Sequence, residues 1–161
     1  MNHTPLNYAL WLLGRRDRSV GEIEEKLSAK KYTVEEIKKS ISFLRKQGFL
    51  DDARFAKHYI ENQLSVKPLG KYQLKMKLKR KFIADEIIEK TITEIGPDRE
   101  MELAREATSK WLKRQNYESG IMNHGEQHKN MEKLTRHLLS RGFEWETIKI
   151  ILEKYKTKLK N

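Results

Sequence analysis

The sequence predicts an all-α protein made of three tandem three-helix repeats that form an elongated, curved array. The main observation is a series of six apolar residues that occurs three times with identical spacings of 4, 5, 5, 4 and 3 residues. The second copy follows the first by 51 residues, and the third follows the second by 60. Because self-similarity in register is typical of tandem repeats, we expect one unit over each of residues 1–50, 51–96 and 97–161. The series are Ile23, Leu27, Tyr32, Ile37, Ile41, Leu44; Leu74, Leu78, Ile83, Ile88, Ile92, Ile95; and Leu134, Leu138, Phe143, Ile148, Leu152, Tyr155.

Signals for β-strands are weak. The chain has three prolines, eight glycines and little sustained alternation of apolar and polar residues, whereas strands and hairpins need alternation and frequent turn residues. Spacings of 3 and 4 instead place apolar side chains on one helical stripe, and the central pair of fives marks a break between two helices. Each copy of the series therefore predicts a helix, a tight turn and a second helix.

A further helix is expected before each pair, over residues 6–16, 53–64 and 101–114. In the first of these, the candidates for burial are Leu10 and Leu13 together with Tyr8 or Trp11. Two capping boxes mark helix starts in the first repeat, one from Ser19 to Glu22 and one from Thr33 to Glu36, because serine or threonine and glutamate satisfy free amides reciprocally. Gly142 suits the helix end at the turn of the third copy.

The connection that follows each leading helix lengthens along the chain. It is most polar over residues 115–130, which contain two glycines, five amide side chains and two histidines. Insertions in one equivalent loop are common in tandem repeats. We therefore expect a flexible surface loop at about 115–130 in the third repeat.

Composition narrows the class of protein. The chain has 161 residues and no cysteine, so disulfides and thiolate metal sites are excluded. No apolar run approaches the roughly 20 residues that a membrane span needs, and the first residues do not read as a secretory signal. We expect a cytoplasmic protein with no membrane association.

No catalytic machinery is visible in the sequence. Phosphate-binding glycine loops and the GxSxG nucleophile motif are missing. His124 and His128 stand four residues apart and could share a helix face, but Gly125 occupies the position where a zinc-hydrolase motif needs glutamate. We therefore predict a protein that is not an enzyme and needs no metal or cofactor, with a metal-dependent hydrolase as the weakest alternative.

Positive charge is the strongest functional signal. The net charge is +11, and no acidic residue occurs between Glu61 and Asp85. On a helix over 71–81, Leu74 and Leu78 should face inward while Lys71, Lys75 and Lys79, together with Lys77, project outward. Like charges at this spacing repel, so an anionic partner explains them best. The candidate DNA- or filament-binding residues are Arg15, Arg16, Arg18, Lys67, Lys71, Lys75, Lys77, Lys79, Arg80 and Lys81.

The nature of the anionic partner stays open at this point. Phosphates are the default because cations that contact them release counterions, and an acidic protein surface is the competitor. Helix-turn-helix pairs also suggest a sequence-specific repressor. However, no helix carries an evident set of arginine and amide side chains for base edges, and the spread of charge favours backbone contacts.

Several segments resemble the RecX family of proteins that regulate the RecA recombinase. Ala9 to Ser19, followed by Glu22, Ile23, Lys26 and Leu27, is similar to the family's opening repeat. Residues 48–56, with the sequence GFLDDARFA, resemble its most distinctive segment. The regions 67–78 and 138–143 resemble its second and third repeats, although Phe82 stands where the family usually has glycine.

The resemblance implies a specific biological role. RecX proteins consist of tandem three-helix repeats, bind along the groove of the RecA–DNA filament, and usually inhibit its ATPase, coprotease and strand-exchange activities. They also bind DNA. For this chain the resemblance implies a non-catalytic monomer that acts in homologous recombination, DNA repair and the SOS response. Its partners would be the RecA filament and single- and double-stranded DNA, without strong sequence preference.

Overall fold

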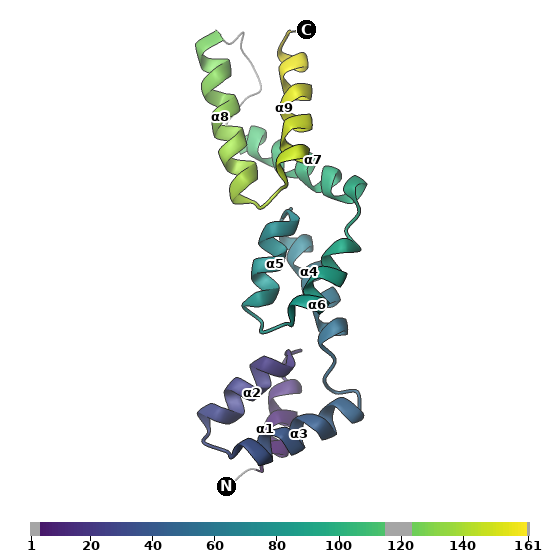
Figure 1. The fold of residues 1–161 in the computed structure, drawn as a ribbon. Coiled ribbons are helices and arrows are strands. Elements are labelled where there is room, and N and C mark those ends of the chain that lie inside the picture. Colours follow the sequence, from purple (N-terminus) through teal and green to yellow (C-terminus); the bar gives the residue numbers. More distant parts are fainter. Residues whose placement is uncertain (1–3, 115–123, 161) are drawn as a thin grey trace. The chain divides into compact units, whose positions relative to one another are not determined.

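The computed structural model describes the main chain of residues 4–114 and 124–160 and the side chains of 4–114 and 128–157. All regular structure within these ranges is helical (Figure 1). The helices are α1 (Pro5–Leu13), α2 (Val20–Ala29), α3 (Val34–Lys46), α4 (Asp52–Val66), α5 (Lys71–Lys79), α6 (Asp85–Thr93), α7 (Pro97–Arg114), α8 (His124–Ser140) and α9 (Trp145–Lys160). The predicted all-α class with helices in groups of three is confirmed. No helix in the described part of the chain is both long and apolar enough to cross a membrane.

The chain divides into two compact units. The first contains residues 1–60 and 77–91, and the second contains residues 61–76 and 92–161. The middle group of helices contributes to both units, so the repeat boundaries at 50/51 and 96/97 stay a prediction.

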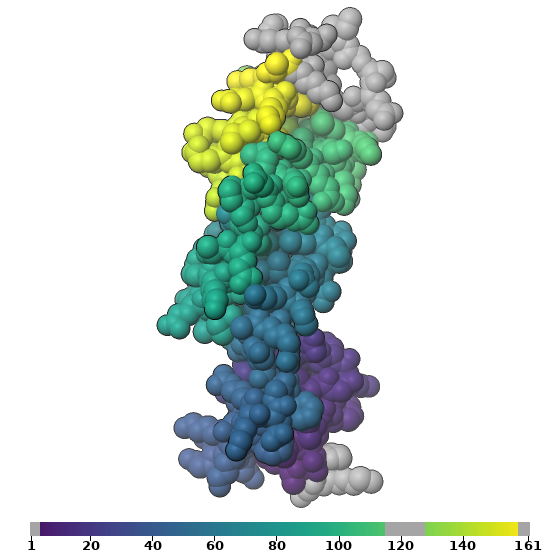
Figure 2. Space-filling view, turned by 90° about the vertical axis from the view of Figure 1, so that its right-hand side faces the viewer, coloured from purple at the N-terminus to yellow at the C-terminus, as the bar shows by residue number. Residues whose placement is uncertain are grey.

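In the first unit, α1, α2 and α3 contact one another around a common core. Ile23, Leu27 and Leu44 are fully buried in it, and Ala9 is small enough to let α1 approach closely. In the second unit α7, α8 and α9 contact one another in the same way, and α9 can be seen against α7 in Figure 2. Leu134, Leu138 and Ile148 are fully buried there.

The repeated apolar series accounts for about half of the buried hydrophobic side chains. Its members are buried apart from four that are partly buried, namely Tyr32, Ile95, Leu152 and Tyr155. Both capping boxes form as predicted: the Ser19 hydroxyl accepts from the Glu22 amide at 3.1 Å, and the Thr33 hydroxyl accepts from the Glu36 amide at 3.3 Å. The helix starts in the first repeat are therefore fixed by local chemistry.

The turns between the paired helices share one backbone conformation. Lys31 has a φ of 62°, Phe82 of 58° and Gly142 of 82°. These residues are separated by the same 51 and 60 positions as the apolar series. A left-handed residue just after a helix closes its last turn. The same conformation therefore recurs even where the sequence has lysine or phenylalanine in place of glycine.

Two boundaries differ from the sequence-based expectation. The expected loop at 115–130 is wrong for residues 124–130, because α8 begins at His124; residues 115–123 lie outside the described part. Buried Asn130 extends the stripe of Leu134 and Leu138 by one turn at a spacing of four, so packing keeps this polar segment helical. The helix expected from residue 101 begins earlier, at Pro97, where proline suits a first helical position.

Candidate partner-binding surface

Within the first unit, the beginning of α2 packs against the turn that precedes α6. We call this contact the first joint, and define it by Ser19–Glu22, Asp52 and Lys81–Phe82. The Ser19 hydroxyl donates to the carbonyl oxygen of Lys81, and the Asp52 carboxylate accepts from the Val20 amide at 2.8 Å. Burial raises the pKa of Asp52, and the hydrogen bond from Val20 partly opposes that rise. The first joint thus satisfies the free Val20 amide at the start of α2 with a side chain from the start of α4.

Glu22 is the charged centre of the first joint. Its Oε1 lies 2.8 Å from the Lys81 Nζ and 3.0 Å from the Arg16 Nη2, and the residue is 7% exposed. Burial alone would raise the pKa of this carboxyl, but hydrogen bonds from Arg16 and Lys81 and their positive charges lower it to about 2. Glu22 is therefore ionised at neutral pH and neutralises two of the predicted binding cations.

In the second unit, the beginning of α5 packs against the turn that precedes α9. This second joint comprises Gly70–Gln73, Glu100 and Ser140–Glu144. The Gly70 amide donates to the Arg141 carbonyl at 2.9 Å, and the Tyr72 amide donates to the Gly142 carbonyl at 3.1 Å. Main-chain bonds therefore replace the side-chain bond made by Ser19 in the first joint.

An ion pair also anchors the second joint. The Lys71 Nζ lies 3.0 Å from the Glu100 Oε2, with the lysine side chain 18% exposed and the glutamate side chain 2% exposed. Glu100 also accepts from the Glu144 amide at 3.3 Å. A nearly buried carboxylate that holds a lysine and a main-chain amide is a structural anchor.

These contacts change the interpretation of two predicted cations. The expectation that Lys71 projects outward is wrong, because its ammonium group is held by buried Glu100. Lys81 is similarly tied to Glu22, and its Nζ lies 5.6 Å from the centre of the Tyr59 ring. Removing Lys71 would leave buried Glu100 without its ion-pair partner, and removing Lys81 would leave buried Glu22 with Arg16 alone. We therefore assign Lys71 and Lys81 to the architecture of the joints.

The remaining predicted cations differ in accessibility. Arg15, Arg16, Lys67, Lys79 and Arg80 are exposed. Among them, the Lys79 Nζ lies 3.0 Å from the exposed carboxylate of Asp85, and Arg16 holds Glu22. A surface pair like that of Lys79 contributes little energy and does not prevent other contacts.

Three further members of the predicted set are partly buried, namely Arg18, Lys75 and Lys77. Lys75 and Lys77 interact with neighbouring residues. The Nε of Arg18 is buried without a hydrogen-bond partner among the described residues. Of the cations predicted from the sequence to bind DNA or the filament, the structure brings Arg16 and Lys81 together at Glu22.

Sequence reasoning missed a cluster of aromatic and cationic side chains on α1. Trp11 is 53% exposed, although it was a candidate for burial; Ala9 and Leu12 are the buried positions. Its ring stacks on that of Tyr8 with 5.8 Å between centroids, and the Arg15 guanidinium lies 4.6 Å from its centroid. The Lys30 Nζ lies 5.5 Å from the Tyr8 centroid. The sequence signal that could have found this cluster is the spacing of three and four residues between positions 8, 11 and 15, which brings side chains close together on a helix.

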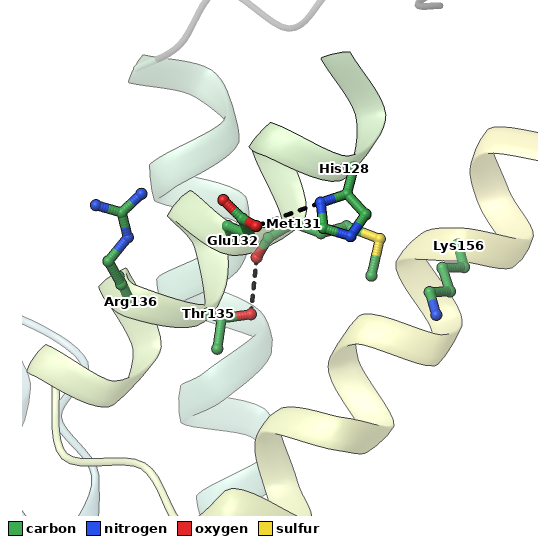
Figure 3. A pocket seen from close by; sticks show the side chains of 6 residues that line it. All are labelled: His128, Met131, Glu132, Thr135, Arg136 and Lys156. Carbon is green, nitrogen blue, oxygen red and sulfur yellow. Dashed lines mark hydrogen bonds and ion pairs between the residues drawn. The ribbon is translucent and has the colours of Figure 1, made fainter. Parts of the chain in front are cut away.

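An open groove lies between α8 and α9, with a volume of about 490 Å³. Figure 3 shows His128 turned toward Glu132, with Arg136 and Lys156 at the sides. The His128 Nδ1 lies 3.3 Å from the Glu132 Oε1. Across the described residues, no group of three or more acidic, histidine or cysteine side chains could hold a metal ion; the side chain of His124 lies outside them. The exposed lining of the groove is therefore mainly apolar, and Arg136 and Lys156 give it a basic rim.

Comparison with known proteins gives one consistent match. The model of the first three-helix domain of RecX matches residues 6–44, and that of the second matches residues 51–92. The regulatory protein RecX of Prosthecochloris aestuarii is 33% identical over 94% of this chain and 93% of its own length. The regulatory protein RecX of Clostridium tetani is 31% identical over 91% of this chain, which spans 64% of that longer relative. The crystal structure of RecX from Lactobacillus salivarius has the same fold, with a TM-score of 0.81 at 22% identity over 95% of both chains. The chain therefore belongs to the RecX family of regulatory proteins.

Proposed function

We propose that this protein binds the RecA–DNA filament and inhibits its ATPase, strand-exchange and coprotease activities without catalysing a reaction itself. The observation that carries the proposal is the likeness to regulatory RecX proteins over more than nine tenths of the chain. The proposal places the protein in the cytoplasm, where RecA filaments assemble on DNA, and it takes the protein to act as a monomer.

The distribution of charge supports an anionic partner. The net charge of +11 creates a field that attracts polyanions such as DNA over a distance. The cations available for direct contact are the exposed members of the predicted set, with Lys75 and Lys77 beside them. Because such contacts displace counterions from phosphates, DNA affinity should fall steeply as the salt concentration rises.

The two joints support a role for the fold in presenting this surface. Lys71 and Lys81 act inside the joints, so their contribution is to hold successive helices in place. In this proposal the exposed cations contact phosphate or an acidic protein surface, with partly buried Lys75, Lys77 and Arg18 beside them; the exposed ones are Arg15, Arg16, Lys67, Lys79 and Arg80.

The decisive experiment measures the ATPase rate of the matching RecA on single-stranded DNA with substoichiometric amounts of this protein. A marked fall in rate is expected, since one regulator bound along a filament affects many subunits. An unchanged rate accompanied by DNA binding would contradict the regulatory role and leave a general DNA-binding protein.

A charge reversal locates the contact surface. The double variant Lys67→Glu/Arg80→Glu should weaken DNA binding and reduce the slope of log affinity against log salt by about one for each lost phosphate contact. The matched control is Lys38→Glu/Lys39→Glu, which removes the same charge from exposed positions on α3. Equal losses in both variants would mean that only net charge matters, and would remove these residues from the site.

A further inference from the structure

Helix α1 is apolar on almost every side, yet part of it is uncovered. Its sequence, PLNYALWLL, contains one polar side chain, that of Asn7. Ala9 and Leu12 are buried, and Leu6, Leu10 and Leu13 pack against the core. Trp11 remains 53% exposed. A helix that is apolar all round is normally covered, so the exposed side of α1 is a candidate for contact with a partner.

The exposed side carries a row of flat side chains. Tyr8, which is partly buried against the core, and exposed Trp11 share one face of α1 at a spacing of three residues, and Arg15 stands in the turn just after the helix. The interplanar angle between the Tyr8 and Trp11 rings is 15°, and Arg15 continues the row as a cation–π contact. Lys30, from the end of α2, lies beside Tyr8. The row is therefore partly ordered before any partner arrives.

Equivalent helices do not carry this arrangement. The fully buried alanines that set the register of the three leading helices are Ala9, Ala56 and Ala104. In this register Trp11 corresponds to His58 in α4 and to Glu106 in α7. In α7 the Glu106 Oε1 makes an ordinary surface ion pair with the Lys110 Nζ at 2.7 Å. In α4 Phe55 stacks on Tyr59 with 5.7 Å between centroids, but Phe55 is buried. The exposed tryptophan in the row is thus a property of α1 and is not a requirement of the fold.

The charge around the row is positive. Residues 1–16 contain no acidic residue. Of the two acids that follow next along the sequence, Glu22 is buried and held by Arg16 and Lys81, and Asp17 is exposed, with its Oδ2 4.0 Å from the His58 Nδ1. An aromatic ring flanked by an arginine and a lysine offers stacking faces and phosphate contacts at the same place. Unpaired nucleotides use both, whereas the bases of a duplex are already stacked on each other.

We infer that Tyr8, Trp11, Arg15 and Lys30 form a stacking platform for an unpaired nucleobase, so that α1 distinguishes single-stranded from double-stranded nucleic acid. The inference rests on the proposed function in that it assumes DNA binding. The base stacks on the outer face of the Arg15 guanidinium or takes its place on Trp11. Lys30, and Arg15 when displaced, contact the adjacent phosphates.

The test uses the full-length protein with three ligands of equal length: oligo-dT, an abasic oligonucleotide and a duplex. Trp11→Ala should weaken oligo-dT binding by about 5- to 100-fold, the range typical of base–aromatic stacking, and leave duplex binding unchanged. Wild-type protein should bind the abasic strand about as weakly as Trp11→Ala binds oligo-dT, and the variant should no longer distinguish the two strands. Trp11→Phe should retain part of the affinity.

The matched control is Trp145→Ala, because Trp145 is 52% exposed and lies in the other unit; it should bind all three ligands like the wild type. In a Trp145→Phe background, oligo-dT should also quench the tryptophan emission, since the remaining Trp111 is buried. Circular dichroism checks that each variant is folded.

Several outcomes would overturn the inference. Equal losses of Trp11→Ala for oligo-dT, abasic strand and duplex would reduce the platform to a charged surface. Unchanged binding of all three ligands, with weakened binding to a protein partner, would make it a protein-docking site. Both results would leave the proposed function standing. Failure of the wild type to bind any nucleic acid would overturn this inference together with the DNA-binding part of the proposed function.

Discussion

The two joints solve the same packing problem with opposite residues. In the first joint the glycine is on the helix, at Gly21, and the turn presents Phe82. In the second joint the helix presents Tyr72, at the position equivalent to Gly21, and the glycine is on the turn, at Gly142. A Cβ on Gly21 would lie nearer than 3.0 Å to Phe82, and a Cβ on Gly142 would lie nearer than 3.0 Å to Gln73. Helix and turn therefore approach closely in both joints.

The comparison explains how Phe82 can stand at the position that is equivalent to Gly142. Close approach requires that one of the two facing residues lacks a Cβ, and Gly21 meets this need in the first joint. Phe82 still has the left-handed φ that the turn requires. In the first joint the two functions of a turn glycine, conformation and clearance, are therefore carried by different residues. In the second joint Gly142 carries both, and Gly70 adds clearance on the helix side, because a Cβ there would lie nearer than 3.0 Å to the main chain of Gly142.

The largest expected effect comes from Gly142→Ala, which removes both functions at once. The new Cβ would collide with the main-chain nitrogen of Gln73 and would stand at a φ of 82°. We expect a loss of about 3 kcal/mol or more in the free energy of unfolding, measured by urea titration followed by circular dichroism.

Gly48→Ala is the matched control for this loss. Gly48 has a similar φ of 73° with nothing within 4 Å of its Cβ position, so it should lose only about 1 kcal/mol from conformation. Equal losses in the two variants would show that clearance at the second joint is unimportant.

The second-largest effect concerns Glu22, the buried carboxylate of the first joint, whose counterpart in the second joint is Glu100. Glu22→Gln should lower the free energy of unfolding at neutral pH by about 2–3 kcal/mol, because the ionised carboxylate no longer balances Arg16 and Lys81. The pKa of Glu22 in the folded protein, about 2, lies below its ordinary value of 4.5. The stabilisation is therefore present above about pH 4.5 and is lost as the pH falls toward 2.

The measurement is the difference in unfolding free energy between wild type and Glu22→Gln across this pH range. The difference should shrink steadily on acidification. Glu24→Gln changes an exposed carboxylate on the same helix and should alter stability little at any pH. A difference for Glu22→Gln that is independent of pH would contradict the role assigned to the ion pairs.

The helices could be predicted from the sequence, whereas the ion pairs at the two joints, Glu22 with Lys81 and Glu100 with Lys71, could not. The apolar series and the capping boxes are local patterns, and both were sufficient to place helices and turns. The pairing of Lys81 with Glu22 spans 59 residues, and that of Lys71 with Glu100 is also long-range. Helix periodicity therefore placed Lys71 on the surface, and the local run of positive charge placed Lys81 among the binding residues. Trp11 was ambiguous for another reason: on a helix that is apolar all round, periodicity does not identify the exposed side.

A smaller effect tests whether the residue without a Cβ can be on either side of the first joint, at position 21 of the helix or at position 82 of the turn. Gly21→Ala should cost about 2 kcal/mol through overlap with the Phe82 Cβ. Phe82→Gly in the same chain should restore most of this loss, because the first joint then has its glycine on the turn like the second. The coupling energy of the double-mutant cycle should be about 1–2 kcal/mol. Additive effects would mean that Gly21 and Phe82 do not limit each other.

The smallest expected effect concerns the first turn, where Lys31 has a φ of 62° and an exposed side chain. Lys31→Gly should stabilise the protein by about 0.5–1 kcal/mol, since a left-handed conformation is costly for a residue with a Cβ and is not for glycine, although glycine also gains freedom in the unfolded chain. Lys31→Ala is the control, because it removes the same charge but keeps the Cβ and should leave stability unchanged. If Lys31→Gly behaved like Lys31→Ala, the strain at this turn would be negligible. Phe82 has the same left-handed conformation as Lys31, so its conformation would then cost little as well. The position of the glycine in each joint would in that case be decided by the space available for a Cβ alone.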